Sequence, residues 1–154
     1  MRFFAISAAF LSLSGIVASA TIEKRNCPEA ARFGTLSVFP LTASAGDDIS
    51  VSLSLNCPTM QFGIVPQFLD YTLEVPEASN NGNEQPIVLT RRTYTFVPGT
   101  IQPMDDFTVQ IPHGPFVAGA PYNIVLNMVY PIDGTDGSSV LVETKLSVPI
   151  TINA

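Results

Sequence analysis

"ISVSLSL", residues 49–55, alternates apolar and serine side chains without interruption. Successive side chains of a β-strand point to opposite faces, so four apolar residues share one face and three serines share the other. This pattern is typical of a strand that covers a hydrophobic core with one face and meets water with the other. The stretch therefore predicts a β protein built from half-buried strands.

The same period of two recurs along the chain, and clusters of Gly, Pro, Asn and Asp separate the alternating segments. It predicts further strands at residues 33–39, 61–65, 69–75, 87–97, 107–111, 122–130 and 140–152. Seven or eight short strands with polar outward faces favour a single antiparallel β-sandwich over a parallel sheet. Imperfect alternation within residues 87–97 predicts a bulge or a switch between sheets. Pro149 cannot donate to a ladder, so the last strand is expected at an edge.

The connection between residues 111 and 122 indicates which kind of sandwich this is. It begins after "QIP", contains Gly119, and ends at Tyr122, the first residue of the next expected strand. In immunoglobulin-like and fibronectin-III-like sandwiches, a tyrosine at such a corner ties back the preceding loop through its hydroxyl group. Gly119 and Tyr122 are therefore the expected corner residues, and we predict a sandwich of one of these two types.

The N-terminal residues predict a secreted protein. Residues 1–20 combine a basic start, an apolar stretch and an Ala-x-Ala cleavage site that ends at Ala20, as signal peptides do. Residues 21–25 form a short pro-segment that ends in the dibasic pair Lys24-Arg25, which leaves residues 26–154 as the sandwich domain. No later stretch is long and apolar enough to cross a membrane as a helix. We expect secretion, with association with a cell wall as a further alternative.

The two cysteines, Cys27 and Cys57, both lie in the expected mature chain. In an oxidising compartment, an even pair with no histidine or further cysteine beside it predicts a disulfide bond. The alternatives, a reactive thiol and half of a metal site, lack the neighbouring residues that they need.

The charge of the chain argues against nucleic acid and anionic membranes as partners. The whole chain has a formal net charge of −6, and only four of its basic residues follow residue 25. A protein this acidic has no field to attract polyanions. We expect a monomer without a cofactor.

Three segments carry a resemblance to a known family. They are "ASAGDDISVSLSL", similar to an AGxxIxxxL strand, the central "FGIV", and "FTVQIPHGPFVAGAPYNIVLNMVY", similar to a VxVPxxFxAGxYxL block. With the signal and pro-segment, they resemble fungal small secreted proteins with an immunoglobulin-like fold, most nearly the necrosis-inducing secreted-protein effectors of plant-associated fungi. The resemblance implies action by binding, including interference with plant immune receptor kinases. Fungal wall-assembly proteins with a similar sandwich are a second resemblance.

Catalytic and metal-binding motifs are weak. His113 is the only histidine, and no G-x-S-x-G elbow accompanies it, so nucleophilic catalysis is not expected. The pairs Asp47-Asp48 and Asp105-Asp106 are interpreted as solvated turn residues and not as the carboxylates of a glycosidase. "DGTDGSS", residues 133–139, lacks the further ligands of a calcium loop and is interpreted as a hairpin turn.

These observations predict a secreted, non-enzymatic binding module, effector-like, whose partner is a host or extracellular protein. The alternatives are a structural or glycan-binding protein of the producer's own wall, which would bind polysaccharide, and a surface protein without a specific ligand. Loops and strand edges carry recognition on rigid sandwiches. The candidate contact residues are Asn81, Arg91, Arg92, Asp133 and Asp136, together with the last strand.

Overall fold

The computed structural model describes residues 27–82 and 84–153, and this part of the chain is an all-β structure with antiparallel sheets, as the alternation predicted. The expected signal peptide, its cleavage after Ala20 and the Lys24-Arg25 pair lie outside the described residues.

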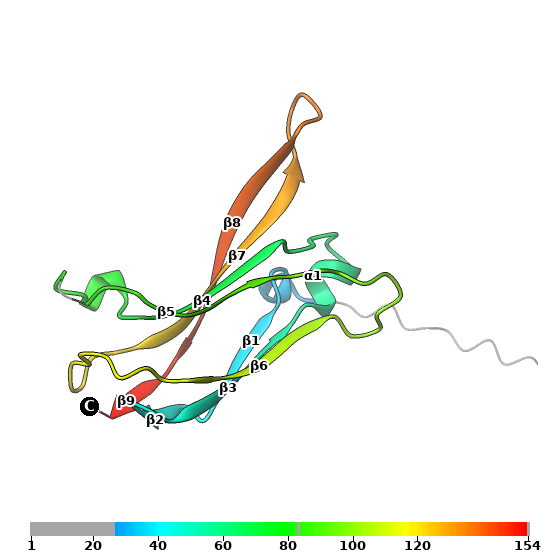
Figure 1. Cartoon of the computed structure of the whole chain (residues 1–154). Coiled ribbons are helices and arrows are strands. Elements are labelled where there is room, and N and C mark those ends of the chain that lie inside the picture. Colours follow the sequence, from blue (N-terminus) through cyan, green and yellow to red (C-terminus); the bar gives the residue numbers. More distant parts are fainter. Residues whose placement is uncertain (1–26, 83, 154) are drawn as a thin grey trace, which may run out of the picture.

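Two antiparallel sheets make up most of the molecule (Figure 1). The three-stranded sheet has the order β1 (Thr35–Phe39), β3 (Asp48–Ser54), β6 (Met104–Gln110). The four-stranded sheet has the order β5 (Ile87–Thr93), β4 (Phe68–Glu74), β7 (Asn123–Asp133), β8 (Ser139–Pro149). A short parallel pair, β2 (Thr42–Ser44) and β9 (Thr151–Asn153), joins the beginning of the domain to its end.

The alternating segment at residues 49–55 forms most of β3, and its apolar and serine side chains divide between two faces as the alternation predicted. Its apolar side chains are fully buried and join one hydrophobic cluster with those of β4 and β7. Each fully buried aliphatic side chain stabilises the fold by about 1.5–3 kcal/mol relative to exposure. The members of this shared core from the three strands are Ile49, Val51, Leu53, Leu69, Tyr71, Leu73, Ile124, Leu126 and Met128.

The strand expected at residues 61–65 does not form, and that prediction is wrong. The preceding residues form helix α1 (Asn56–Met60), and the chain leaves it through a turn in which the amide of Ile64 donates to the carbonyl of Pro58. Short 3₁₀ turns, η1 (Glu29–Ala31) and η2 (Glu77–Ser79), complete the helical segments of the described chain. The buried Ile64 anchors this turn, so its apolar character serves a loop and not a strand.

The last expected strand divides into two. β8 ends at Pro149, and after the buried Ile150 the chain pairs with β2 as β9. β8 has β7 as its single ladder partner, which confirms that it is an edge strand of the four-stranded sheet. With this division and the unexpected β2, the part of the chain that the structure describes has nine strands.

The irregularity expected in residues 87–97 is a bulge in β5. Thr72 pairs with Val88 and the preceding Tyr71 pairs with Thr90, so Leu89 is an extra residue on β5. Thr72 is buried beside this bulge, and its hydroxyl donates to Glu74 Oε1 at 2.6 Å.

The corner before β7 contains the hydrogen bond that its sequence suggested. The main-chain amide of Val117 donates to the Tyr122 hydroxyl at 3.0 Å, and the Tyr122 ring packs edge-on against Phe116 with centroids 5.6 Å apart. Gly119 lies between them with φ of +76°, a conformation that other residues adopt only with strain. The loop is therefore held by its own tyrosine and turned by its glycine.

Replacing Tyr122 by phenylalanine should lower the free energy of unfolding by about 1 kcal/mol, because the Val117 amide loses its acceptor while the ring packing is retained. Urea unfolding of the variant and of wild type measures the difference. Tyr130→Phe is the matched control, since the structure gives the Tyr130 hydroxyl no hydrogen bond within the described chain. Equal midpoints for Tyr122→Phe and wild type would show that the hydroxyl does not hold the loop.

Candidate binding surface on the β7–β8 ribbon

β7 and β8 are longer than the strands beside them, and their turn ends project from the sandwich (Figure 1). β4 pairs with β7 only as far as Val129, opposite Phe68. Beyond that point, residues 130–133 of β7 and 139–142 of β8 pair with each other alone. We call this two-stranded projection the ribbon.

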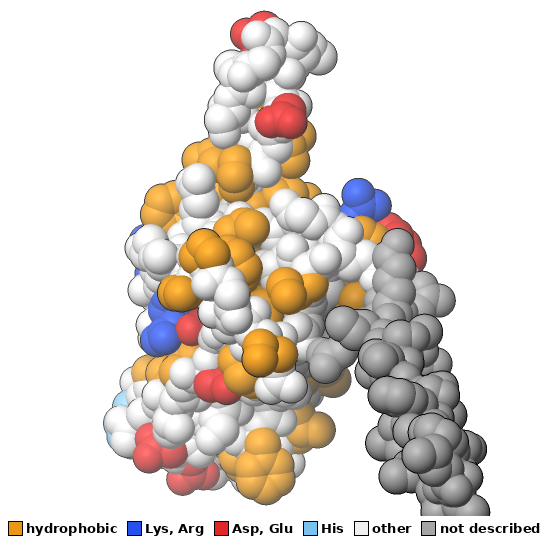
Figure 2. All heavy atoms as spheres, turned by 90° about the vertical axis from the view of Figure 1, so that its right-hand side faces the viewer, with side chains coloured by type: hydrophobic (Ala, Val, Ile, Leu, Met, Phe, Trp, Pro, Cys, Tyr) orange, Lys and Arg blue, Asp and Glu red, His pale blue; other side chains and the backbone are white. Residues whose placement is uncertain are grey.

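Apolar side chains lie in the open on this ribbon. Ile132 is 45 % exposed, Val140 opposite it is 43 % exposed, and Leu141 on the other face is 52 % exposed. Figure 2 shows the ribbon rising from the body, with hydrophobic side chains near its base and acidic ones toward its tip. Val140 begins the strand expected at residues 140–152, but it lies outside the core because the ribbon has left the body of the molecule at this point.

The tip of the ribbon is a turn built by its own polar residues. The amide of Gly134 donates to the carbonyl of Ser138 at 2.7 Å, and the amide of Ser138 donates to Asp136 Oδ1 at 3.0 Å. The Ser138 hydroxyl first, and the Ser138 amide second, lower the pKa of Asp136 below its ordinary value by hydrogen bonding to its carboxylate. Asp136 thus supports the turn while remaining exposed, and Asp133 is exposed at the end of β7.

The base of the ribbon is supported by the N-terminal segment. The rings of Tyr130 and Phe33 lie 6.0 Å apart, and the guanidinium of Arg32 lies over the rings of Phe33 and Phe62, at 5.9 Å and 5.6 Å. This segment begins at Cys27, whose disulfide bond joins it to α1. Packing at the base therefore depends on the position of the N-terminal segment.

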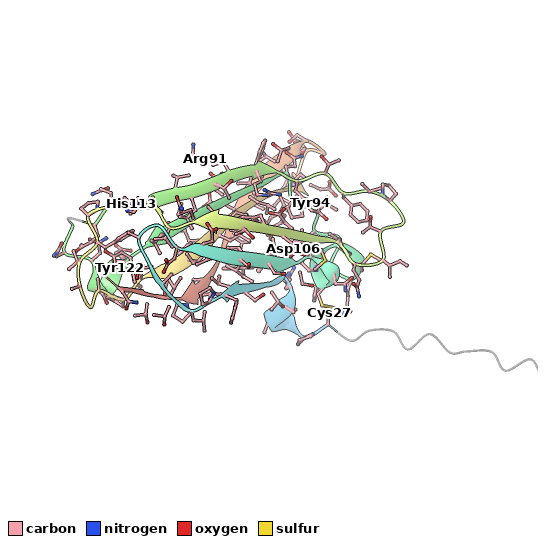
Figure 3. The ribbon with its side chains drawn as sticks, turned by 60° about the horizontal axis from the view of Figure 1, so that its bottom comes forward. Cys27, Arg91, Tyr94, Asp106, His113 and Tyr122 are labelled. Carbon is pink, nitrogen blue, oxygen red and sulfur yellow. A yellow bond between two sulfur atoms is a disulfide. The ribbon has the colours of Figure 1, made fainter. Side chains whose placement is uncertain are left out.

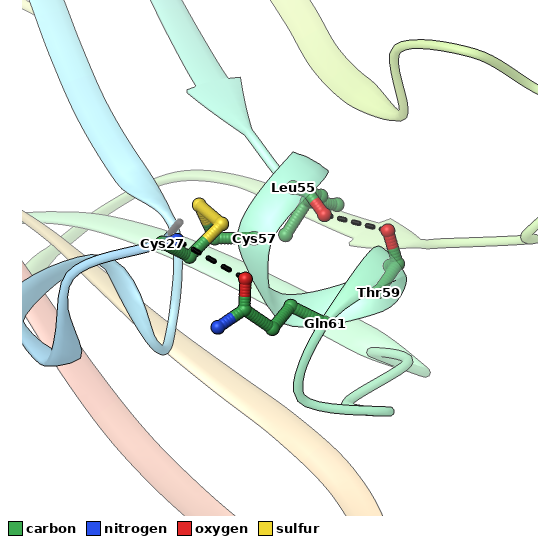
Figure 4. Close-up of a disulfide and its surroundings, with 5 residues drawn as sticks. All are labelled: Cys27, Leu55, Cys57, Thr59 and Gln61. Carbon is green, nitrogen blue, oxygen red and sulfur yellow. Dashed lines mark hydrogen bonds between the residues drawn. A yellow bond between two sulfur atoms is a disulfide. The ribbon is translucent and has the colours of Figure 1, made fainter. Parts of the chain in front are cut away.

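The disulfide between Cys27 and Cys57 confirms the pairing expected from sequence (Figure 4). The amide of Cys27 also donates to Gln61 Oε1 at 3.0 Å, so the segment contacts both ends of the α1 region. In the helix itself, the Thr59 hydroxyl donates to the carbonyl of Leu55 at 2.6 Å. A disulfide bond is typical of proteins in oxidising extracellular compartments.

The other expected contact residues do not join the ribbon. Asn81 belongs to the loop that follows β4. The end of β4 next to this loop pairs with the beginning of β7, whereas the ribbon begins beyond the other end of β4, at Phe68. The loop therefore lies at the end of the sheet opposite the ribbon. Asn80 organises it by accepting from the amide of Gly82 at 2.7 Å and donating to the carbonyl of Glu84 at 2.6 Å. The loop and the ribbon are thus separate surfaces.

Arg91 and Arg92 point to opposite faces of β5. Arg91 is exposed and lies 3.4 Å from Asp70, while Arg92 donates through Nε to Asp105 Oδ1 at 2.9 Å. Arg92 also lies over the Phe107 ring, at 4.9 Å from its centroid. Of the pair, Arg91 alone extends from the outer surface of the sheet.

Asp105 was interpreted as a solvated turn residue, and that interpretation is wrong. It belongs to β6, is only 8 % exposed, and accepts from the Tyr71 hydroxyl at 3.0 Å in addition to Arg92. Burial, with the Asp105 charge as the second cause, raises the pKa of Tyr71 far above its ordinary value. The cluster joins β5 and β6, the edge strands of the two sheets, through the hydrogen bond of Arg92 with Asp105.

His113 lies at the end of the molecule that also holds Tyr122, away from Cys27 and Tyr94 (Figure 3). Its exposed imidazole lies over Gly46, and the structure gives it no hydrogen bond among the described residues. Across all the residues that the structure describes, no group of three or more His, Cys, Asp or Glu side chains is arranged to hold a metal ion. The helices described there are all too short to cross a membrane.

Sequence reasoning missed Ile132 and Leu141 as surface residues. The available signal was length, since the alternating runs that form β7 and β8 each extend to eleven residues while β4 and β5 have seven. A pair of strands longer than its neighbours must leave part of its apolar side chains without cover.

Comparison of the chain with models of protein families, with curated proteins and with solved structures found no match.

Proposed function

We propose that this protein is a secreted, non-enzymatic binding module, effector-like, that engages a host or extracellular protein through the ribbon. The observation that carries the proposal is the exposure of Ile132, Val140 and Leu141 on a projection that no other strand among the described residues covers. An isolated two-stranded hairpin is marginally stable in water and gains from burying its apolar side chains against a partner. The acidic tip next to them favours a partner with basic residues at the rim of its contact surface.

The scaffold supports the same proposal. We assign it to the immunoglobulin-like or fibronectin-III-like sandwiches, in view of its three-stranded and four-stranded antiparallel sheets and the Tyr122 corner. The disulfide bond supports secretion, together with the signal sequence expected in residues 1–20. Such domains present loops and hairpins from a rigid core, which suits recognition.

The proposal is tested with immobilised protein exposed to extracellular fluid from plant tissue and, in parallel, to insoluble β-glucan and chitin. Ile132→Ser should weaken capture of a host protein by about tenfold or more, because a central apolar anchor is lost. Val88→Ser is the matched control, since Val88 is 49 % exposed on β5, which β4 separates from the ribbon strands β7 and β8. Wild type and Val88→Ser should capture the same protein equally.

Firm retention on polysaccharide with no protein captured would overturn the proposal in favour of a wall role. Release of new reducing ends from either glycan would overturn the non-enzymatic assignment.

A further inference from the structure

β8 is an edge strand whose outward main-chain amides make no hydrogen bond within the described chain, although β1 of the three-stranded sheet approaches β8. Ile150, directly beyond its end, donates to the carbonyl of Tyr122 at 2.9 Å, in register with the β7–β8 ladder. Because main-chain groups alternate sides along a strand, the even-numbered residues of β8 face β7 and the odd-numbered ones face outward. The outward N–H groups belong to Leu141, Glu143, Lys145 and Ser147, and no proline interrupts this row.

The side chains of β8 divide in the same way. Glu143 and Lys145 are exposed on the outer face, whereas Val142, Thr144 and Leu146 are half-buried on the inner face. Lys145 lies 3.7 Å from Glu74, and the structure gives Glu143 no ion pair within the described chain. The edge therefore shows one negative and one positive side chain, two residues apart.

From this pattern we propose that β8 pairs with β8 of a second copy of the chain, antiparallel, about a two-fold axis that passes through Thr144. In that register each Glu143 lies directly opposite Lys145 of the other copy, which forms two opposite-charge cross-strand pairs. On the inner face, Val142 meets Leu146 of the other copy and Thr144 meets its counterpart. The two four-stranded sheets become one continuous sheet, with the same patch on both subunits.

The charges select this register among the neighbouring ones. An axis through Glu143 would place the two glutamates opposite each other, and an axis through Lys145 would do the same for the lysines, which is unfavourable. The axis through Thr144 alone places Glu143 opposite Lys145, because Thr144 lies midway between the two charges.

No other free edge of the described sheets offers such a match. β1 carries no charged residue, β5 carries only arginines, and β6 carries only aspartates, one of them used within the fold. A row of exposed edge amides invites pairing, and proteins commonly guard it with charge. On β8, the charges of Glu143 and Lys145 disfavour pairing with most other strands but complement those of a second β8. This proposal replaces the monomer expected from sequence.

Two single variants and their mixture test the charge pairs by analytical ultracentrifugation. Glu143→Lys alone and Lys145→Glu alone place like charges opposite each other, so each should dimerise at least about tenfold more weakly than wild type. Mixed together, they restore both opposite-charge pairs and should form a heterodimer. A wild type that stays monomeric at high concentration, or a mixture that behaves like its components, would overturn the proposal.

Cysteine cross-linking tests the register independently of charge. Thr144 faces its counterpart as a non-hydrogen-bonded pair with Cα atoms about 4.5 Å apart, within the range of a disulfide bond. Thr144→Cys should therefore form a covalent dimer under mild oxidation, seen by intact mass without reductant. In the matched control Val142→Cys, the two cysteines lie four residues apart, about 13 Å, and should not join. Equal cross-linking of both variants would overturn the Thr144 axis.

These tests measure mass alone and use no host protein or polysaccharide. Failure of the dimer would leave the ribbon proposal standing. Capture of the host protein by Ile132→Ser as strong as by wild type would contradict the ribbon proposal and leave the dimer standing, because Ile132 lies on β7 and not at the paired edge.

Discussion

Replacing both Cys27 and Cys57 by serine should lower the free energy of unfolding by about 3–4 kcal/mol. The bond closes a loop with a sequence separation of 30 residues, and in the chain-entropy model its removal restores that freedom to the unfolded chain. A native domain is stable by only about 5–15 kcal/mol, so this loss is a large part of the total.

Urea unfolding of the double variant and of wild type, each with and without reductant, measures this effect. Reductant should lower the midpoint of wild type to that of the double variant and leave the double variant unchanged. Loss of the link should also weaken the packing of Phe33 on Tyr130, so amide exchange should rise first at the base of the ribbon. Coinciding midpoints of wild type and double variant without reductant would contradict the prediction.

Replacing Asp105 by alanine should cost about 2–3 kcal/mol. The Tyr71 hydroxyl and the Arg92 guanidinium both lose their acceptor between the sheets, and a buried polar group without a partner carries its full desolvation penalty. The effect stays below the 3–5 kcal/mol typical of a broken, fully buried ion pair, because Arg92 is partly exposed and can turn to water.

Asp106→Ala is the matched control for this prediction. Asp106 follows on the same strand but is exposed, so its replacement should change stability by no more than about 0.5 kcal/mol. Both variants keep the backbone of β6 and remove one carboxylate. Equal unfolding midpoints for Asp105→Ala and Asp106→Ala would show that the cluster between the sheets contributes little.

The parts of the fold that follow from local rules could be predicted from the sequence. Alternation identified β3, β4 and β7, because the period of side chains along a strand depends on the strand alone. The imperfect pattern around Leu89 indicated the bulge, and the spacing of Gly119 and Tyr122 indicated the corner contact. The short runs at 61–65 and 42–44 were misjudged, since so few residues carry too little pattern to separate a turn from a strand.

The candidate surface could be predicted only in part. Asp133 and Asp136 were among the expected contact residues, but the exposed Ile132, Val140 and Leu141 were not. An apolar residue on a strand is buried only if a neighbouring strand extends as far as it does. For the residues of the ribbon, burial therefore depends on the lengths of β4 and of the strands in the opposite sheet, which lie far away in sequence.

By itself, the sequence determined the all-β class, the disulfide bond, the edge position of β8 and the corner at Tyr122. Each of these depends on residue type, spacing or a missing amide, which are properties of a short segment. Only the tertiary structure decided that the ribbon projects and that Asp105 is buried between Tyr71 and Arg92. It also decided that Glu143 and Lys145 share a free edge. Burial and edge exposure are set by what lies across the sheet or the core, and side chains distant in sequence supply that cover.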